Sequence, residues 1–247
     1  MTILVTRPEP DNAATADTLR QRGFAVLLAP MLQFEALPIR PDEDAKYSGV
    51  IITSANALRA TRLHLLPLIE LPLYAVGDRT ADVARNAGFA NVHSADGDVA
   101  SLRQLIVDIH PRPERKTPLL YLSGSDISGD LVAGLGNDGI AVNPLVVYRM
   151  IPVAELSDAA RAGLAAQTID AVLHYSPRSA AAYVAAIRGA ALEIAGLAAP
   201  QVCLSEAVAR VLREAGATRL VVAEKPQETA LLEALARAVP ALQKRRS

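Results

Sequence analysis

The sequence predicts an α/β protein with two doubly wound parallel sheets. Short apolar runs alternate with stretches of helical spacing along the 247 residues, and this alternation is typical of parallel sheets covered by helices. Most turns that follow an apolar run contain glycine, serine, threonine or asparagine, which suits a tight strand-to-helix connection. The third observation is a repeat: residues 72–88 and 200–216 align without a gap, and six of the 17 positions are identical.

The repeat extends beyond this stretch. The segments that end at Gly23 and Gly139 align at an offset of 116 residues, and residues 50–66 correspond to a segment about 122 residues later. Four strand–turn–helix units therefore occur twice in the same order. We predict two internally duplicated, flavodoxin-like domains, each with a parallel sheet of about five strands.

Each element follows from its own pattern. The first helix is expected at 11–22, where Ala13, Ala14, Ala16 and Leu19 are available for a buried face and Gly23 ends the helix. Strands are expected at 3–6, 24–29, 49–52, 73–76, 91–93, 119–122, 145–148, 171–175 and 220–222, with 139–142 leading into the seventh. Further helices are expected at 57–66, before Gly88, and at 99–109, 130–135, 156–166, 180–187 and 229–238; residues 200–216 repeat the strand and helix of 72–88.

Two extended segments decide how the chain is divided into domains. Residues 32–38 and 145–152 are apolar, contain or adjoin proline, and show no helical spacing. If they pair as a two-stranded β-ladder, one domain holds residues 1–31 plus 153–247 and the other holds 39–144. The alternative is two sequential halves, and the sequence alone favours neither.

The composition excludes several classes of protein. A formal net charge of −1 with 51% apolar residues argues for a globular core and against a nucleic-acid-binding protein, which should show a basic face. Cys203 is the only cysteine, so we expect no disulfide framework and no thiolate metal site. The chain enters a strand at once, without signal-peptide features, and its most apolar window, 63–76, is interrupted by proline and glutamate. We expect a cytoplasmic protein without a membrane span or a bound metal.

The turns after the strands contain the candidate binding residues. In open parallel sheets ligands bind beyond the carboxyl ends of the strands, and hydroxyl, amide and cationic groups beside helix N-termini suit carboxylates or phosphates. The candidates are Arg7, Ser54, Asn56, Gly77, Ser123, Gly124, Ser176, Ser179 and Lys225. The alternative is that the hydroxyl and amide residues only cap helices. The sequence contains no GxxxxGK[ST], GxGxxG, GxSxG or HExxH motif.

Two further residues have both a functional and a structural interpretation. Tyr148 ends the strand at the second crossing, where it is either an interfacial aromatic or a phenol that acts on a ligand. His174 precedes a turn but has no evident acid or nucleophile partner in the sequence, so we predict that it is a packed residue.

The ordered set of motifs resembles the uroporphyrinogen-III synthase family over essentially the whole chain. The matching motifs are 4–8 (LVTRP), 52–56 (ITSAN), 74–81 (YAVGDRTA), 146–148 (VVY), 175–179 (YSPRS), and Lys225-Pro226 followed by Ala230-Leu231. The resemblance implies two α/β domains joined by a two-stranded ladder, with the first segment returning to the C-terminal domain. It also implies a lyase of tetrapyrrole and heme biosynthesis that needs no cofactor.

The resemblance implies that the substrate is hydroxymethylbilane, a linear tetrapyrrole with eight carboxylates, which is closed to uroporphyrinogen III with inversion of the last ring and loss of water. Tyr148 matches the family tyrosine that assists departure of the hydroxyl, and Thr80 matches the family's cleft threonine. Ser54, Asn56, Ser176 and Ser179 are expected to bind substrate carboxylates, with Arg7 and Lys225 as further candidates. A monomer and a transient contact with the preceding enzyme of the pathway are also expected.

Two corners depart from the family pattern. Glu206 stands where the family often has a hydroxyl residue, and Ser128 where it often has arginine, so these corners are weaker candidates for contacts with an acidic substrate. Two alternatives to an active enzyme stay open. One is a two-domain sensor that closes on an anionic small molecule, and the other is a paralogue that has lost activity.

Overall fold

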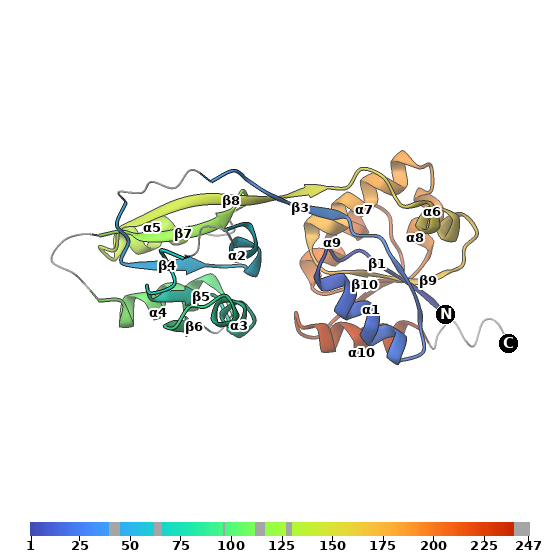
Figure 1. Cartoon of the computed structure of the whole chain (residues 1–247). Helices are drawn as coiled ribbons and strands as arrows, with labels where there is room; N and C mark the ends of the chain where they lie inside the picture. Colours follow the sequence, from blue (N-terminus) through green and yellow to red (C-terminus); the bar gives the residue numbers. More distant parts are fainter. Residues whose placement is uncertain (40–44, 62–65, 96, 112–116, 127–129, 240–247) are drawn as a thin grey trace. The chain divides into compact units, whose positions relative to one another are not determined.

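The chain divides into two compact units in the computed structural model (Figure 1). The structure describes residues 1–39, 45–61, 66–95, 97–111, 117–126 and 130–239. The first unit consists of Met1–Phe34 and Ile151–Ser247, and the second of Glu35–Met150. The first unit is therefore discontinuous in sequence, and the polypeptide leaves it and returns.

In the first unit, a parallel sheet lies between two layers of helices. Its described strands are β1 (Thr2–Val5), β2 (Ala25–Leu28), β9 (Ile169–His174), β10 (Gln201–Cys203) and β11 (Leu220–Val222), in the order β2-β1-β9-β10-β11. Its described helices are α1 (Asp11–Gln21), α6 (Asp158–Ala165), α7 (Pro177–Gly189), α8 (Glu193–Ala198), α9 (Glu206–Glu214) and α10 (Glu228–Ala238). Helices α1 and α10 pack on one face of the sheet, and α6 to α9 on the other.

The second unit has the same layered construction. Its described strands are β3 (Leu32–Ala36), β4 (Gly49–Ile52), β5 (Leu73–Ala75), β6 (Val92–Ser94), β7 (Leu119–Gly124) and β8 (Val142–Pro152), in the order β6-β5-β4-β7-β8-β3. Among β4 to β8, each pair of adjacent strands is parallel. Helices α2 (Ala55–Thr61) and α3 (Asp78–Asn86) cover one face, and α4 (Val99–Ile109) and α5 (Leu131–Asn137) cover the other.

The central strands are buried on both faces. The side chains of Ile3, Leu4 and Val5 in β1 are completely inaccessible to solvent, and so are those of Val50 and Ile51 in β4. Strands between two helix layers have no solvent-facing side, which is why these sequences are continuous apolar runs. The predicted α/β class with parallel sheets is confirmed.

The two sheets share one spatial order of strands. In the first unit, β2-β1-β9-β10-β11 is the order 2-1-3-4-5 in which flavodoxin-like sheets are wound. The second unit has the equivalent order β8-β7-β4-β5-β6. The first of these strands in the sequence, β4, has the position that the third strand, β9, has in the first unit. This happens because the chain leaves the first unit after two strands and completes it only later.

The repeated stretch 72–88 and 200–216 folds alike in both copies. Strands β5 and β10, and helices α3 and α9, begin and end 128 residues apart. Both helices are followed by a glycine in the left-handed region, Gly88 with φ 103° and Gly216 with φ 101°. A residue with a Cβ is strained there, so the glycine ends each helix.

Several predicted boundaries are wrong. The strand predicted at 145–148 is longer than expected, because β8 extends continuously from Val142 to Pro152. Helix α8 was not predicted. Only two of its six residues, Gly196 and Leu197, are buried, and Ile194 is 89% exposed, so the helix has no apolar face to reveal it in the sequence. So short a helix has little propensity of its own and depends on packing.

Strands β3 and β8 are hydrogen-bonded neighbours, and the division between the units falls within both. At one end the N–H of Leu37 donates to the carbonyl of Val147, and at the other the N–H of Val153 donates to the carbonyl of Met31.

Within the described residues, every helix is too short or too polar to cross a lipid bilayer.

Candidate functional site

The second unit contains a cavity at the carboxyl ends of its strands. Its volume is about 430 Å³, within the range of roughly 300–1,000 Å³ that is typical of small-molecule sites. The residues that line it are Thr53, Ser54, Val76, Gly97, Asp98, Val99, Tyr121, Gly124, Asp126 and Tyr148. The sequence prediction named three of these as site residues: Ser54, Gly124 and Tyr148.

The winding of the sheet explains where this cavity lies. Strands β4 and β7 are neighbours at the point where the strand order reverses, and β4 leads to Thr53 while β7 ends at Gly124. The connections after these two strands run in opposite directions, which leaves a crevice between them. The cavity is therefore at the place where a doubly wound sheet usually binds its ligand.

Two hydroxyl groups on neighbouring strands form a pair within the cavity. The phenol oxygen of Tyr121 lies 3.1 Å from Oγ1 of Thr53. Burial raises the pKa of Tyr121 above its ordinary value, against the opposing effect of the Thr53 hydrogen bond, and the nearby Tyr148 raises it further. Tyr121 therefore keeps its proton at neutral pH and is available as a hydrogen-bond donor.

The charged side chains that line the cavity are acidic. Asp98 and Asp126 line it, and the described lining includes neither lysine nor arginine. Asp98 also caps α4, where its side chain accepts the backbone N–H of Ser101 at 2.7 Å. That backbone hydrogen bond lowers the pKa of Asp98, so the carboxylate is ionised at neutral pH. The site combines neutral hydroxyl donors with negative charge.

Gly77 and Thr80 lie at the start of α3 and do not line the cavity. A Cβ at Gly77 would lie 3.3 Å from Cα of Gly97, so the backbone of Gly77 packs closely against a segment that does line it. Thr80 is 8% exposed, and no hydrogen bond joins its hydroxyl to another residue in the described part of the chain.

The remaining predicted residues of this unit have different surroundings. Ser54 precedes α2, and its Oγ accepts the N–H of Asn56 at 3.2 Å, while the Asn56 amide lies 3.8 Å from the sulfur of Met150. Ser123 is 1% exposed, and its Oγ has no hydrogen-bond partner among the described residues. Ser54 thus has both a capping contact and a place in the cavity, whereas Ser123 faces the interior.

In the first unit, Arg7 is held by acidic side chains. Its guanidinium lies 2.8 Å from Glu228 and 3.3 Å from Asp11, and 4.6 Å from the ring centroid of Tyr175. Burial alone would lower the pKa of Arg7, but the hydrogen bond and charge of Glu228, with Asp11, raise it overall. The charge of Arg7 is therefore already compensated, which weakens the prediction that it binds a ligand carboxylate.

The serines after β9 form a capping box. Oγ of Ser176 accepts the N–H of Ser179 at 3.1 Å, and Oγ of Ser179 accepts the N–H of Ser176 at 3.2 Å. This is the capping alternative that the sequence left open. Lys225 is exposed, and within the described ranges it forms no ion pair.

Of the two residues that depart from the family pattern, only Glu206 lies in the part of the chain that the structure describes. Glu206 begins α9, and its carboxylate lies 2.8 Å from the guanidinium of Arg213. This ion pair reduces the negative charge that Glu206 presents. Ser128 lies outside the described residues.

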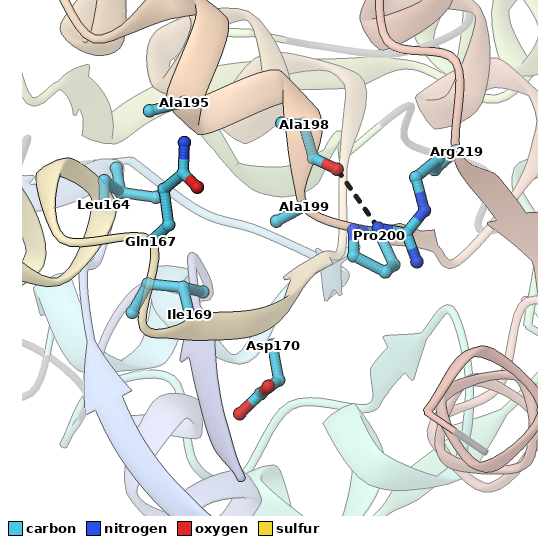
Figure 2. Close-up of a pocket in the computed structure, with 9 residues that line it drawn as sticks. All are labelled: Leu164, Gln167, Ile169, Asp170, Ala195, Ala198, Ala199, Pro200 and Arg219. Carbon is cyan, nitrogen blue, oxygen red and sulfur yellow. Dashed lines mark hydrogen bonds between the residues drawn. The ribbon is translucent and has the colours of Figure 1, made fainter. Parts of the chain in front are cut away.

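A second, smaller cavity of about 210 Å³ lies in the first unit, at the amino ends of the strands (Figure 2). Asp170 lines it and accepts the N–H of Thr2 at 2.7 Å, and Arg219 donates to the carbonyl of Ala198 at 3.4 Å, the contact drawn in Figure 2. Both charged side chains are therefore already hydrogen-bonded to backbone groups. This cavity also lies at the opposite end of the sheet from the usual ligand position.

Sequence reasoning did not single out Tyr121, Asp98 or Asp126. Tyr121 stands two residues before Ser123 in β7, so strand alternation places both on one face, and a tyrosine near a strand end was an available signal. Asp98 was identifiable only as a helix cap. Among the described residues, no group of three or more histidine, cysteine, aspartate or glutamate side chains is arranged to hold a metal ion.

Comparisons with known proteins agree on one family. The family model described as Uroporphyrinogen-III synthase HemD matches residues 13–233. A uroporphyrinogen-III synthase from Chlorobaculum parvum is 26% identical over 197 residues, which are 75% of this chain and 79% of that protein.

Solved structures agree with the fold. A uroporphyrinogen-III synthetase from Helicobacter pylori has a TM-score of 0.64 at 18% identity, over 96% of this chain and 98% of the other. A mutant uroporphyrinogen III synthase from Thermus thermophilus has a TM-score of 0.57 at 20% identity, over 99% of each chain.

Proposed function

Since the chain belongs to the uroporphyrinogen-III synthase family, we propose that it closes hydroxymethylbilane to uroporphyrinogen III, with inversion of the last ring and loss of water. The observation that carries this proposal is the family match, which extends over residues 13–233 and thus over both units. The chain is accordingly a cyclising lyase of tetrapyrrole and heme biosynthesis.

The reaction begins when the bond between the terminal carbon and its hydroxyl breaks. The hydroxyl takes a proton and leaves as water, and the electron-rich pyrrole stabilises the cation that remains. The already substituted α-carbon of the last ring then attacks the cation and gives a spiro intermediate. The bond from this carbon to its original methylene bridge breaks and re-forms at the free α-carbon of the same ring, and loss of a proton restores the pyrrole as the type III isomer. Uncatalysed closure gives type I, so the enzyme must control which carbon is in range, and positioning of this kind can lower a barrier by up to about 7–11 kcal/mol.

The hydroxyl groups of the cavity suit the first step. Tyr148 lines the cavity beside the paired hydroxyls of Thr53 and Tyr121. We assign to Tyr148 the hydrogen bond that assists the departing hydroxyl, because a phenol is a weak acid that can donate without full proton transfer.

The charges of the cavity favour one part of the substrate. Asp98 and Asp126 repel the carboxylate arms and attract a pyrrole on which positive charge develops. The terminal ring with its hydroxymethyl group is therefore the part that fits here. The arms then bind elsewhere, to amide and backbone donors, for which Asn56 and the backbone at Gly77 remain the candidates in this unit. Ser54 lines the cavity and remains a candidate hydrogen-bond donor to the part of the substrate that is bound there.

Replacing Thr80 by valine tests the other candidate catalytic residue. Valine keeps the shape of threonine, and the Thr80 hydroxyl has no partner among the described residues, so the thermal unfolding temperature should stay within about 2 °C of wild type. If the hydroxyl contacts substrate, kcat/KM for type III formation should fall roughly fivefold to tenfold, the size of one hydrogen bond. Unchanged kinetics would remove Thr80 from the site.

The function itself is tested by the product. Purified protein should convert freshly prepared hydroxymethylbilane to the type III isomer, identified by chromatography of the oxidised porphyrins, faster than the type I isomer forms without protein. A sensor would bind the bilane and leave only type I. Type I as the sole product would contradict the proposed activity.

Three finer expectations accompany this function. We propose that the protein is a monomer, that it acts in the cytoplasm, and that it contacts the preceding enzyme of the pathway transiently. Its single cysteine, Cys203, is buried, which is compatible with a reducing compartment. Sedimentation of the protein alone and with that enzyme tests the first and third of these expectations.

A further inference from the structure

Strand β8 contains an irregularity immediately before Tyr148. Ser123 of β7 is paired with Val146, but the next residue, Gly124, is paired with Tyr148, so Val147 is an extra residue in β8. Such a bulge is rare between parallel strands and changes the direction in which the following side chains point. Val147 is completely buried in the core of the second unit, and Tyr148 takes the position opposite Gly124.

The ring of Tyr148 occupies the space that a side chain at position 124 would need. A Cβ on Gly124 would lie 2.7 Å from Cζ of Tyr148, 3.0 Å from Cε2 and 3.0 Å from the phenol oxygen. Real Cβ atoms essentially never come as close as 2.7 Å to another heavy atom, and 3.0 Å is tighter than most real contacts. The backbones are joined here as well, because the N–H of Ser125 donates to the carbonyl of Tyr148 at 2.9 Å. The backbone at Tyr148 is therefore held in place, and a side chain at 124 must displace the ring itself.

We propose that Gly124 and the bulge at Val147 act together to position the phenol of Tyr148 in the cavity, which makes Gly124 a positioning residue for the reaction. The contact is with the phenol end of the ring, so a methyl group at 124 displaces the oxygen itself. Both residues line the cavity. This inference rests on the proposed function and on the role given there to Tyr148.

The proposal differs from a direct contact between Gly124 and substrate. If the backbone of Gly124 binds substrate, an added methyl group weakens binding whether or not residue 148 has a hydroxyl. If Gly124 acts through the Tyr148 hydroxyl, the methyl group has no further effect once that hydroxyl is removed. A double-mutant cycle separates the two cases.

The cycle consists of Gly124→Ala, Tyr148→Phe and the double variant, each assayed for kcat and KM of type III formation. Gly124→Ala should lower kcat about tenfold with KM changed less than threefold, because a displacement of about 1 Å is costly for an oriented group. In the Tyr148→Phe background the same change should alter kcat less than twofold. An equal loss in both backgrounds, or a loss confined to KM, would overturn the proposal.

Gly136→Ala is the matched control, since it adds a methyl group to the same unit where no atom lies within 4 Å. It should leave kcat unchanged. Thermal unfolding of every variant shows whether a loss of kcat reflects loss of folded protein.

A spectroscopic measurement keeps the inference testable if the wild-type protein forms no type III isomer, a result that would contradict the proposed function alone. Fluorotyrosine incorporated at the six tyrosines gives resonances that single Tyr→Phe variants assign. Gly124→Ala should shift the resonance of Tyr148 and leave that of Tyr47 in place. An unmoved Tyr148 resonance would show that Gly124 does not position the ring.

Discussion

Tyr148→Phe should slow formation of the type III isomer about a hundredfold, at the lower end of the range for a group that assists proton transfer. The change removes only the phenol oxygen, and the ring keeps its place over Gly124. Substrate binding should change little, because the carboxylate arms are expected to bind other groups. The measurement is steady-state kcat and KM, with the isomer ratio of the product at each substrate concentration.

Tyr47→Phe is the control for this substitution. Tyr47 belongs to the same unit, its phenol oxygen accepts a hydrogen bond from Asn143 at 3.3 Å, and it does not line the cavity. Its loss should leave kcat unchanged. If both variants retain full activity, the departing hydroxyl receives its hydrogen bond from another group, and the Thr53–Tyr121 pair becomes the next candidate.

Acidification from pH 6.5 to about 4 should cost the folded protein roughly 3 kcal/mol through His174 alone. His174 is completely buried, and burial lowers its pKa to about 4, against the opposing effect of the Gln201 hydrogen bond. Between these two pH values the unfolded chain binds a proton at this histidine and the folded protein does not. The contribution is therefore fully present above pH 6.5 and is lost as the pH falls toward 4.

Burial keeps His174 neutral, and the hydrogen bonds around the ring show which nitrogen carries its proton. The side-chain amide of Gln201 donates to the carbonyls of Gly196 and Ala199, both at 2.8 Å, so its oxygen is left to accept from Nε2 of His174 at 2.8 Å. Nδ1 lies 3.5 Å from Oγ1 of Thr6. A second proton at Nδ1 would place a charge in the core without a carboxylate partner among these contacts. The prediction that His174 is a packed residue is confirmed.

Urea unfolding at pH values from 7 to 4.5 measures this effect, with His174→Gln as the reference because glutamine retains a donor toward Gln201. The free energy of unfolding should fall more steeply for the wild type than for the variant, since other titrating groups are common to both. Parallel curves would show that His174 does not control the acid response.

The order of elements could be predicted because it depends on local patterns. The run Ile3–Val5, the helix that ends before Gly88 and the repeat in 200–216 each specify their structure through near neighbours in the sequence. Helix α8 and the continuity of β8 were not predictable in this way. Both depend on packing against the rest of a unit rather than on a strong local signal.

The candidate site was predicted only in part for a related reason. Ser54, Gly124 and Tyr148 were named from their turns and from the family resemblance, and all three line one cavity. Arg7 and Ser176 occupy similar turns, but Arg7 already forms an ion pair with Glu228, and Ser176 already accepts a hydrogen bond from Ser179. A residue that caps a helix or forms an ion pair has the same turn chemistry as one that binds a ligand, so the sequence does not separate the two roles.

The chain's local patterns thus establish two wound sheets, the glycines that end their helices and the family to which they belong. Folding decides the chemistry of the cavity, because it depends on distances between residues that are far apart in sequence. Tyr121 meets Thr53 across 68 positions, and one extra residue in β8 brings the ring of Tyr148 onto Gly124. Contacts between distant segments depend on strand register, and here the register of β7 and β8 shifts between Ser123 and Gly124.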